Sequence, residues 1–282
     1  MPSAEPAGAP VSRLNHPAIQ AARQLRRRIR RVQSGHLLVE GPHAVAEAIG
    51  HLEQVFLAHP APARASEVAE LCRLADVPVV DVQPHVLAAL ADAETPQGVV
   101  GMARRPPADL AELLDSATLL VVLDRVADPG NLGAILRCAD AAGADGVVLT
   151  AGSVDPTNGK VVRASAGSLF HLPVVDGVRV ADLISACRAR DITLIAAAPD
   201  AGQRYDQLSY TSPTAIVFGN EAHGLSTEMA AATEFTVSVP IQQPVRSGFQ
   251  GHAESLNLAV TTGIVLFEIV RQRQHAGADG DR

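Results

Sequence analysis

Polar side chains able to do chemistry gather in three segments of the sequence, each directly after a predicted apolar strand. The segments are 124–140 (DRVADPGNLGAILRCAD), 216–226 (IVFGNEAHGLS) and 235–268, which begins FTVSVPI. An arginine fork binds phosphate through paired hydrogen bonds, amides orient a substrate, and a carboxylate accepts a proton. The candidate residues are Asn131, Arg137, Glu221, Ser255 and Asn257.

Each of these residues also has a purely structural interpretation. Asn131 and Ser255 are good helix N-caps, Arg137 suits a solvated helix surface, and 216–226 fits a plain strand–turn–helix. Gly219 ends the second strand, where a glycine lets a ligand approach the backbone. The three segments together are therefore more informative than any one of them.

Several common site motifs are absent from the sequence. No GxGxxG follows a predicted strand, which disfavours a conventional dinucleotide site, and neither HExxH nor GxSxG occurs. The stretch from Gly152 to Lys160 has the wrong spacing for a phosphate loop, and Val161 stands where Ser or Thr would hold magnesium. The histidines show no paired metal-ligand spacing, so no metal is expected.

Alternating strands and helices must position the three segments. Continuous apolar runs are typical of a parallel sheet covered on both faces, and ligands of such α/β sheets bind beyond the carboxyl ends of the strands. The predicted strands are 119–123, 146–149, 192–197, 215–218 and 235–239. The predicted helices are 131–142, 158–166, 180–190, 225–232 and 255–271.

The first half of the chain indicates a smaller α/β unit with a basic start. Seven arginines lie between Arg13 and Arg31, and apolar residues recur at helical spacing from Ile19 to Val32. We predict one basic amphipathic helix here, which contacts RNA or DNA or is simply a solvated face. Its candidate phosphate-binding residues are Arg23, Arg26, Arg27 and Arg30.

Composition sets the remaining limits. The 282 residues are 47% hydrophobic and 19% charged, with a formal net charge of −7, so the chain can bury a sizeable core and is not disordered throughout. No apolar run reaches the roughly 18 residues of a membrane helix. Cys72, Cys138 and Cys187 are widely spaced, which predicts free thiols and a reducing cytoplasm.

Taken in order, DPGNLGAILR, IVFGNEAHGLS and VPI…ESLNLAV resemble the SpoU (TrmH-like) family of RNA ribose 2′-O-methyltransferases, part of the SPOUT superfamily. The resemblance covers about 119–270. The first half, through LLVEGPHAVAEAI and ETPQGVVGMA, resembles a small ribosomal-protein-like RNA-binding domain. The expected organisation is a disordered tail at 1–12, an RNA-binding domain at 13–105, a linker at 106–117, a methyltransferase domain at 118–274 and a disordered tail at 275–282.

The resemblance implies an α/β fold with a deep trefoil knot, a homodimer, and S-adenosylmethionine as the methyl donor. It also implies that Arg163 faces RNA. The implied functional polar residues are Asn131, Arg137, Glu221, Ser255 and Asn257. The implied cofactor-binding residues are Ala197, Gly219, Val239, Ile241 and Leu256.

The implied reaction moves a methyl group to a ribose 2′-hydroxyl and requires no metal. Guanidinium is too basic to accept the proton, so we assign Arg137 to binding the RNA phosphate and orienting the hydroxyl, while a substrate phosphate or Glu221 accepts the proton. The expected substrate is 23S ribosomal RNA. The alternatives are transfer RNA, a non-catalytic RNA-binding protein of this fold, and a small-molecule enzyme with a nucleotide cofactor.

One segment departs from the family pattern. Residues 242–253 form a longer link than expected between VPI and ESLN. This link is a lid over the methyl donor, a platform from which Phe249 stacks on a base, or a surface insertion, and the sequence leaves these three open.

Overall fold

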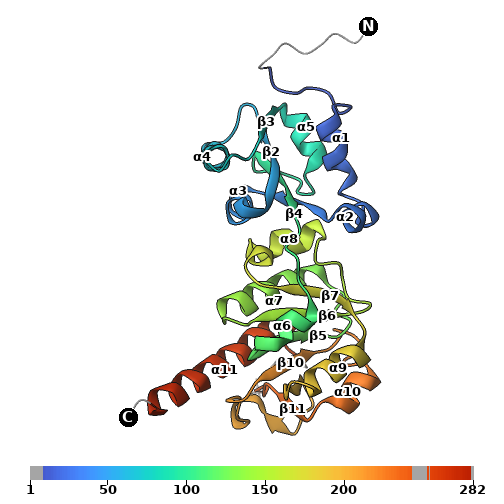
Figure 1. Cartoon of the computed structure of the whole chain (residues 1–282), viewed down its shortest axis with the longest axis vertical. Coiled ribbons are helices and arrows are strands. Elements are labelled where there is room, and N and C mark those ends of the chain that lie inside the picture. The colour runs from blue at the N-terminus through green and yellow to red at the C-terminus, as the bar shows by residue number, and fades with distance from the viewer. Residues whose placement is uncertain (1–8, 243–252, 254, 281–282) are drawn as a thin grey trace, which may run out of the picture. The chain divides into compact units, whose positions relative to one another are not determined.

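The computed structural model of the chain describes residues 9–242, 253 and 255–280 (Figure 1). The chain forms two compact units. The first combines the chain up to Pro107 with Asp155–His171, and the second combines Ala108–Val154 with the chain from Leu172 onward. Residues 155–171 thus pack with the first unit, although they lie inside the segment that the sequence assigns to the second.

A four-stranded sheet forms the centre of the first unit. Its order is β1-β4-β2-β3, in which β4 runs antiparallel to both neighbours while β2 and β3 are parallel. The strands are β1 (His36–Glu40), β2 (Leu52–Ala58), β3 (Val79–Val82) and β4 (Val99–Arg104). The described helices are α1 (Pro17–Gln24), α2 (Arg28–Ser34), α3 (Pro42–Glu47), α4 (Ala63–Leu74), α5 (Pro84–Leu90) and α8 (Gly159–Ser165), with short 3-10 turns at Ile49–His51 and Ser168–Phe170.

The prediction of a single basic helix near the N-terminus is wrong, because the chain turns after Leu25 and forms α1 and α2 instead. Leu25 is buried as predicted, whereas Ile29 and Val32 are 64% and 70% exposed. Arg31 takes the buried position in α2, where its guanidinium lies 2.6 Å from Asp155. A buried ion pair whose guanidinium also donates to Thr157 and to two backbone carbonyls thus outweighs the apolar periodicity in setting which face of α2 is buried.

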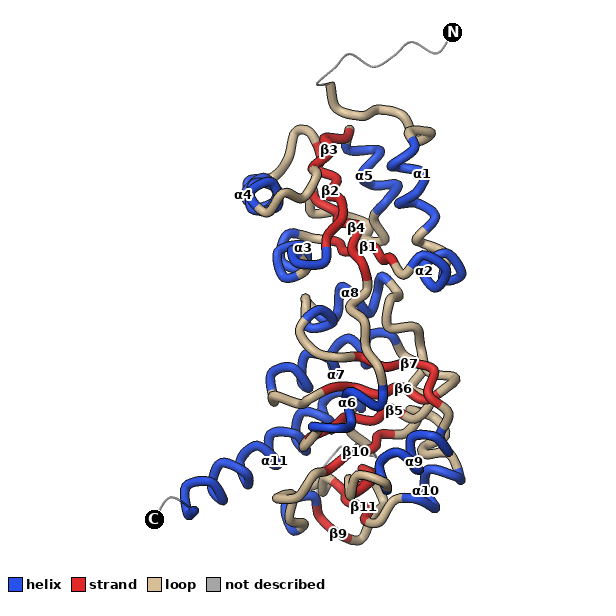
Figure 2. Tube along the Cα trace, viewed as in Figure 1, coloured by secondary structure: helices blue, strands red, loops and turns tan. Residues whose placement is uncertain are grey.

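A parallel seven-stranded sheet forms the centre of the second unit, which confirms the predicted fold class (Figure 2). Its order is β7-β6-β5-β10-β8-β11-β9, and every neighbouring pair is parallel. The strands are β5 (Leu119–Leu123), β6 (Gly146–Thr150), β7 (Val174–Val178), β8 (Thr193–Ala197), β9 (Gln203–Arg204), β10 (Thr214–Phe218) and β11 (Phe235–Ser238).

Helices cover both faces of this sheet. One face packs against α6 (Leu110–Ser116), α9 (Val180–Arg188) and α10 (Thr227–Ala232) in a single apolar cluster. Side chains alternate along a strand, so Leu120 and Val122 of β5 point into this cluster and Val121 points to the opposite face. There α7 (Pro129–Ala141) and α11 (Leu258–Gly280) pack together, with a short 3-10 turn at Tyr205–Gln207 near α11 (Figure 2).

The last helix differs at both ends from its prediction over 255–271. It begins at Leu258, because the side chain of Asn257 caps it, and it continues to Gly280 through positions expected to lie in a tail. No helix among the described residues is long and apolar enough to cross a membrane.

Candidate functional site

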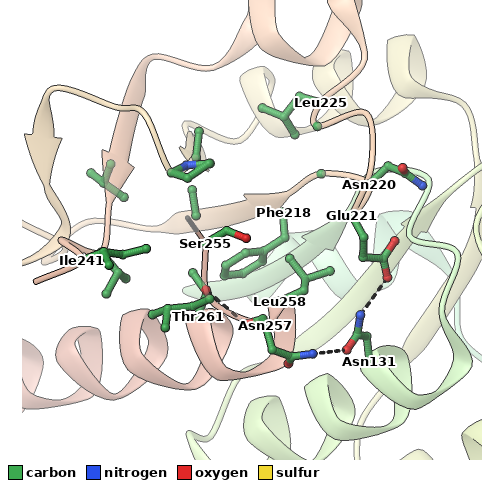
Figure 3. Close-up of a pocket in the computed structure, with 18 residues that line it drawn as sticks. Asn131, Phe218, Asn220, Glu221, Leu225, Ile241, Ser255, Asn257, Leu258 and Thr261 are labelled. Carbon is green, nitrogen blue, oxygen red and sulfur yellow. Dashed lines mark hydrogen bonds between the residues drawn. The ribbon is translucent and has the colours of Figure 1, made fainter. Parts of the chain in front are cut away.

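A cavity of about 360 Å³ lies in the second unit, where β8, β10 and β11 end and α11 begins (Figure 3). This is the edge at which parallel α/β sheets bind their ligands, and the volume lies within the range of small-molecule sites. Its lining residues are Asn131, Ala197, Ala198, Pro199, Phe218, Gly219, Asn220, Glu221, Gly224, Leu225, Val237, Val239, Ile241, Ser255, Leu256, Asn257, Leu258 and Thr261.

All five residues expected to bind the cofactor line this cavity. Ala197 ends β8, Gly219 follows β10, Val239 and Ile241 follow β11, and Leu256 precedes α11. Segments far apart in the sequence therefore meet at one point, because parallel strands end at the same edge of a sheet.

Gly219 is held at this position by close backbone packing. A Cβ at position 219 would lie 2.6 Å from the backbone nitrogen of Leu225 and would also collide with the carbonyl carbon of Gly224. The turn that carries Glu221 consequently folds back directly onto the end of β10, and Asn220 pairs with Gly224 across it. A side chain at 219 would force this turn away from the cavity.

Three of the predicted polar residues form one hydrogen-bonded row, which we call the amide row: Glu221, Asn131 and Asn257 (Figure 3). The Nδ2 of Asn257 donates to the Oδ1 of Asn131 over 2.9 Å, and the Nδ2 of Asn131 donates to a Glu221 oxygen over 2.9 Å. The backbone N–H groups of Ala127 and Asp128 donate to the same carboxylate, at 3.1 and 3.2 Å. The row thus ties all three sequence motifs together.

Both ends of the amide row fix the direction of its hydrogen bonds. At one end the Oδ1 of Asn257 accepts from the backbone N–H groups of Ala259 and Val260, as a helix N-cap does. At the other end ionised Glu221 can only accept. Each amide between these ends therefore has one possible orientation, with its Nδ2 toward Glu221.

Glu221 stays ionised because of these contacts. Partial burial raises the pKa of Glu221. The hydrogen bonds from Asn131 and from the backbone of Ala127 and Asp128 lower it by more than burial raises it, so the net pKa lies below the usual value. A carboxylate that already accepts three hydrogen bonds and holds its proton weakly is a poor general base. Its position suits a residue that orients Asn131.

Ser255 and Arg137 lie differently from the amide row. Ser255 is exposed and lines the cavity, but it is not the cap of α11, so that structural interpretation is wrong. Arg137 is exposed on α7 and does not line the cavity. It follows Asn131 by six residues, which places it about 240° further around the helix. No described residue forms a hydrogen bond or ion pair with its guanidinium, so it is available for a substrate phosphate.

Sequence reasoning missed one buried carboxylate next to the site. Asp124 directly follows β5 and is fully buried. Its oxygens accept from the hydroxyl of Thr150 at 2.9 Å and from the backbone N–H of Ser226 at 2.6 Å. Asp124 therefore anchors the far end of the turn that carries Glu221. The available signal was an acidic residue directly after an uninterrupted apolar strand. Phe218, Leu258 and Thr261 of the lining were also missed.

The arginines expected to bind RNA have different surroundings within the first unit. Arg26 pairs with Asp92 at 3.1 Å, and Arg163 pairs with Glu40, also at 3.1 Å. The Glu40 side chain is only 8% exposed, so Arg163 compensates a buried charge and is committed to that contact. The predicted arginines without a carboxylate partner among the described residues are Arg23, Arg27 and Arg30.

The cavity suits S-adenosylmethionine in its chemistry. Its walls are largely apolar, with side chains such as Phe218, Leu225 and Ile241 that can hold an adenine ring. Glu221 places a negative charge beside the cavity, which matches a cationic sulfonium. The lid or stacking roles considered for 242–253 lie mostly outside the described residues and stay predictions.

Comparison with known proteins supplies an independent view of the chain. Residues 118–267 match the SpoU rRNA Methylase family, and residues 16–101 match the MRM3-like substrate binding domain. An uncharacterized tRNA/rRNA methyltransferase of Synechocystis is 35% identical, over 96% of this chain and 97% of the relative. A 23S rRNA guanosine 2′-O-methyltransferase of Bacillus subtilis is 31% identical, over 85% and 90%.

A solved structure agrees with these sequence matches. The SpoU methyltransferase AviRb from Streptomyces viridochromogenes, in complex with AdoMet, superimposes with a TM-score of 0.79 at 29% sequence identity. The alignment covers 92% of this chain and 100% of the other. The likeness therefore includes both compact units.

Proposed function

Because the chain belongs to the SpoU rRNA methylase family, we propose that it transfers a methyl group from S-adenosylmethionine to a ribose 2′-hydroxyl of 23S ribosomal RNA. The observation that carries this proposal is the amide row at the edge of a largely apolar cavity. The name of the Bacillus subtilis relative supports the substrate.

Bound S-adenosylmethionine supplies a methyl group that is already activated by its sulfonium. The chain therefore has to bind two substrates, align them and exclude competing geometries. In this proposal Ala197, Gly219, Val239, Ile241 and Leu256 hold the methyl donor. Asn131 and Asn257, fixed in orientation by Glu221, set the polar edge that faces the ribose.

Proton transfer needs an acceptor other than Glu221. Arg137 binds the RNA phosphate through its planar fork and orients the 2′-hydroxyl. The lowered pKa of Glu221 and its three existing hydrogen bonds leave it as a positioning residue. A phosphate oxygen of the RNA then accepts the proton.

We further propose a homodimer that works in the cytoplasm, where ribosomal RNA is found. The support for a dimer is the outer face of α11, where Val260 and Phe267 are 52% and 51% exposed. These residues are seven positions apart and so lie on one side of the helix. The family's trefoil knot and the domain boundaries at 13–105 and 118–274 stay predictions.

The decisive experiment is methyl transfer from labelled S-adenosylmethionine to unmodified total RNA, with wild type and Arg137→Ala in parallel. We expect label in 23S RNA that survives alkali as a resistant dinucleotide and is lost in the variant. Label in transfer RNA would keep the reaction and overturn the substrate. Binding of S-adenosylmethionine and RNA without any transfer, on naked or partly assembled ribosomal RNA, would indicate the non-catalytic alternative.

A further inference from the structure

The first unit contains a cavity that the proposed reaction does not use. It measures about 360 Å³ and lies between α1, α2 and the strands β1, β2 and β4. Its apolar part is formed by Leu25, which is 5% exposed, and by half-buried Met102 of β4. A flat apolar ring face can pack against these two side chains.

The polar part of this cavity has groups that can read the edge of a ring. Glu53 accepts from Arg104 at 2.6 Å and from His36 at 2.7 Å, and these bonds hold the pKa of Glu53 below its usual value against the opposing effect of burial. A carboxylate has about four acceptor sites, so further donors can still bind. The amides of Gln24 and Gln33 supply both donors and acceptors.

One cation without a carboxylate partner among the described residues lines the same cavity. Arg30 lines it, and its guanidinium contacts only the side chain of Gln33 among the described residues, at 3.4 Å. Arg23 lies in α1 and Arg27 directly precedes α2, so both are close in sequence to the lining residues without lining the cavity themselves. An apolar floor, a hydrogen-bonding edge and a positive rim together match a base attached to a phosphate backbone. The chain has no Trp and few other aromatic residues, so apolar and arginine surfaces have to take the place of aromatic stacking.

We propose that this cavity binds one unstacked nucleobase of the RNA substrate, while Arg23, Arg27 and Arg30 bind the neighbouring phosphates. This inference rests on the proposed function, since it takes RNA as the substrate. It assigns to the first unit the capture of a splayed, single-stranded nucleotide other than the methylated one. Specific RNA recognition commonly uses such exposed bases.

The methionines of the chain provide a direct probe. There are three, Met1, Met102 and Met229. Met102 lines the cavity, whereas Met229 is fully buried in the second unit and serves as the internal reference. With methyl-¹³C-methionine in the full chain, a short single-stranded RNA of mixed sequence should shift the Met102 signal and leave Met229 in place. An abasic ribose-phosphate chain of the same length should leave both unchanged.

Variants of the cavity test how much base binding contributes to RNA affinity, apart from the binding of phosphates by arginines. Ala21→Trp fills the rim of the cavity without changing charge and should weaken RNA binding about tenfold, as should Gln24→Ala combined with Gln33→Ala. The matched controls Gln20→Ala and Arg64→Ala, at exposed positions that do not line the cavity, should change the dissociation constant less than about twofold. Thermal midpoints within a few degrees of wild type exclude a folding defect. Loss of the RNA-induced Met102 shift in the Gln24/Gln33 variant then ties the weaker binding to this cavity.

Each outcome decides the inference. An unmoved Met102 signal with bound RNA, an equal shift with the abasic chain, or unchanged RNA affinity in Ala21→Trp would overturn it. Normal methyl transfer by the wild type in the same preparations would then leave the proposed function standing. If the wild type shows neither RNA binding nor methyl transfer, both the inference and the proposed function are overturned.

Discussion

Asn131 must donate to one neighbour and accept from another, so an isosteric change at this residue tests the amide row. Asn131→Asp replaces the donor that lies 2.9 Å from Glu221 with a second carboxylate oxygen. We expect single-turnover methyl transfer to fall about 30-fold, since a lost charged hydrogen bond and a like-charge contact cost about 2 kcal/mol. The affinity for S-adenosylmethionine, measured by calorimetry, should change much less.

The matched control is Asn158→Asp, the same change at an asparagine that caps α8, whereas α7 is capped by Asp128 and not by Asn131. The Oδ1 of Asn158 accepts from the backbone N–H of Lys160 at the start of α8, and an aspartate caps equally well. Its methyl transfer should stay within about twofold of wild type. Equal losses in the two variants would contradict a specific role for the amide row.

The ionisation of Glu221 predicts how stability depends on pH. Its pKa in the folded chain lies below the usual value, so the stabilisation is fully present above roughly pH 4.3 and is lost as the pH falls through the lower folded pKa. The difference in Tm between wild type and Glu221→Gln should therefore be constant from about pH 5.5 to 7.5 and shrink in stronger acid. A difference that shrinks near neutral pH would restore Glu221 as a candidate base.

At the scale of residues, the sequence motifs predicted the members of the site better than their partners. Asn131, Glu221 and Asn257 could be named because they stand in three motifs, DPGN, FGNE and SLN, which together resemble one family. Their mutual hydrogen bonds could not, since nothing in a linear pattern tells which amide faces which. Arg137 shows the same limit, because helical spacing places it off the apolar face without telling whether it reaches the cavity.

Among the elements, the turn after β10 is set by the close approach at Gly219. In Gly219→Ala the new Cβ would meet the backbone of Gly224 and Leu225, which cannot rotate away as a side chain can. We expect a loss of about 2 kcal/mol in the free energy of unfolding and at least tenfold weaker binding of S-adenosylmethionine. Gly202→Ala, with open space at its Cβ, is the control and should behave as wild type in both measurements.

Helix α2 is held by Arg31, which donates to Asp155, Thr157 and two backbone carbonyls. Arg31→Ala leaves the nearly buried Asp155 without the buried partner that lies 2.6 Å from it, and should cost about 3 kcal/mol in denaturant unfolding. Arg28 is 71% exposed and lies 3.9 Å from the same carboxylate, so Arg28→Ala should cost less than about 0.5 kcal/mol. Similar costs for the two changes would mean that charge alone, without burial, positions α2.

The positions of strands with continuous apolar runs could be predicted from the sequence. The positions of elements that depend on a single polar contact, or that lack an apolar run, could not. The structure places β5 over the predicted residues, and β6, β8, β10 and β11 differ by a residue at an end. The missed strand β7 carries Asp176 and Gly177, and β9 has only two residues, so neither shows the pattern. The predicted basic helix failed because buried Arg31 overrides the spacing of Ile29 and Val32.

In the whole molecule, the chain passes between the two units three times, at 107–108, 154–155 and 171–172. A fragment of residues 1–107 lacks α8 and leaves Glu40 without Arg163 and Arg31 without Asp155. We expect this fragment to lose about 3 kcal/mol or more of stability and to melt without a sharp transition. Joining 155–171 to it through a flexible linker should restore a cooperative melt, followed by circular dichroism. A sharp, equally stable melt of 1–107 alone would contradict this.

The sequence could not predict that residues 155–171 pack with the first unit. Residues 155–171 supply the loop and helix that follow β6, as the pattern of the segment in which they lie predicts, and that segment matches one family as a whole. Their affiliation depends on contacts more than a hundred positions away, such as Arg31 with Asp155 and Glu40 with Arg163. Local periodicity in the sequence does not predict such long-range pairs.

The placement of 155–171 also constrains which parts of this chain can be exchanged by recombination. A recombination event at the linker near 107 would bring a new substrate-binding half together with an old α8, and so a new residue 40 with an old residue 163. Only exchanges in which the two charges still complement each other would inherit a stable first unit. A replacement of the first hundred residues of this chain should therefore give a stable first unit only if the new residue 40 still pairs with Arg163.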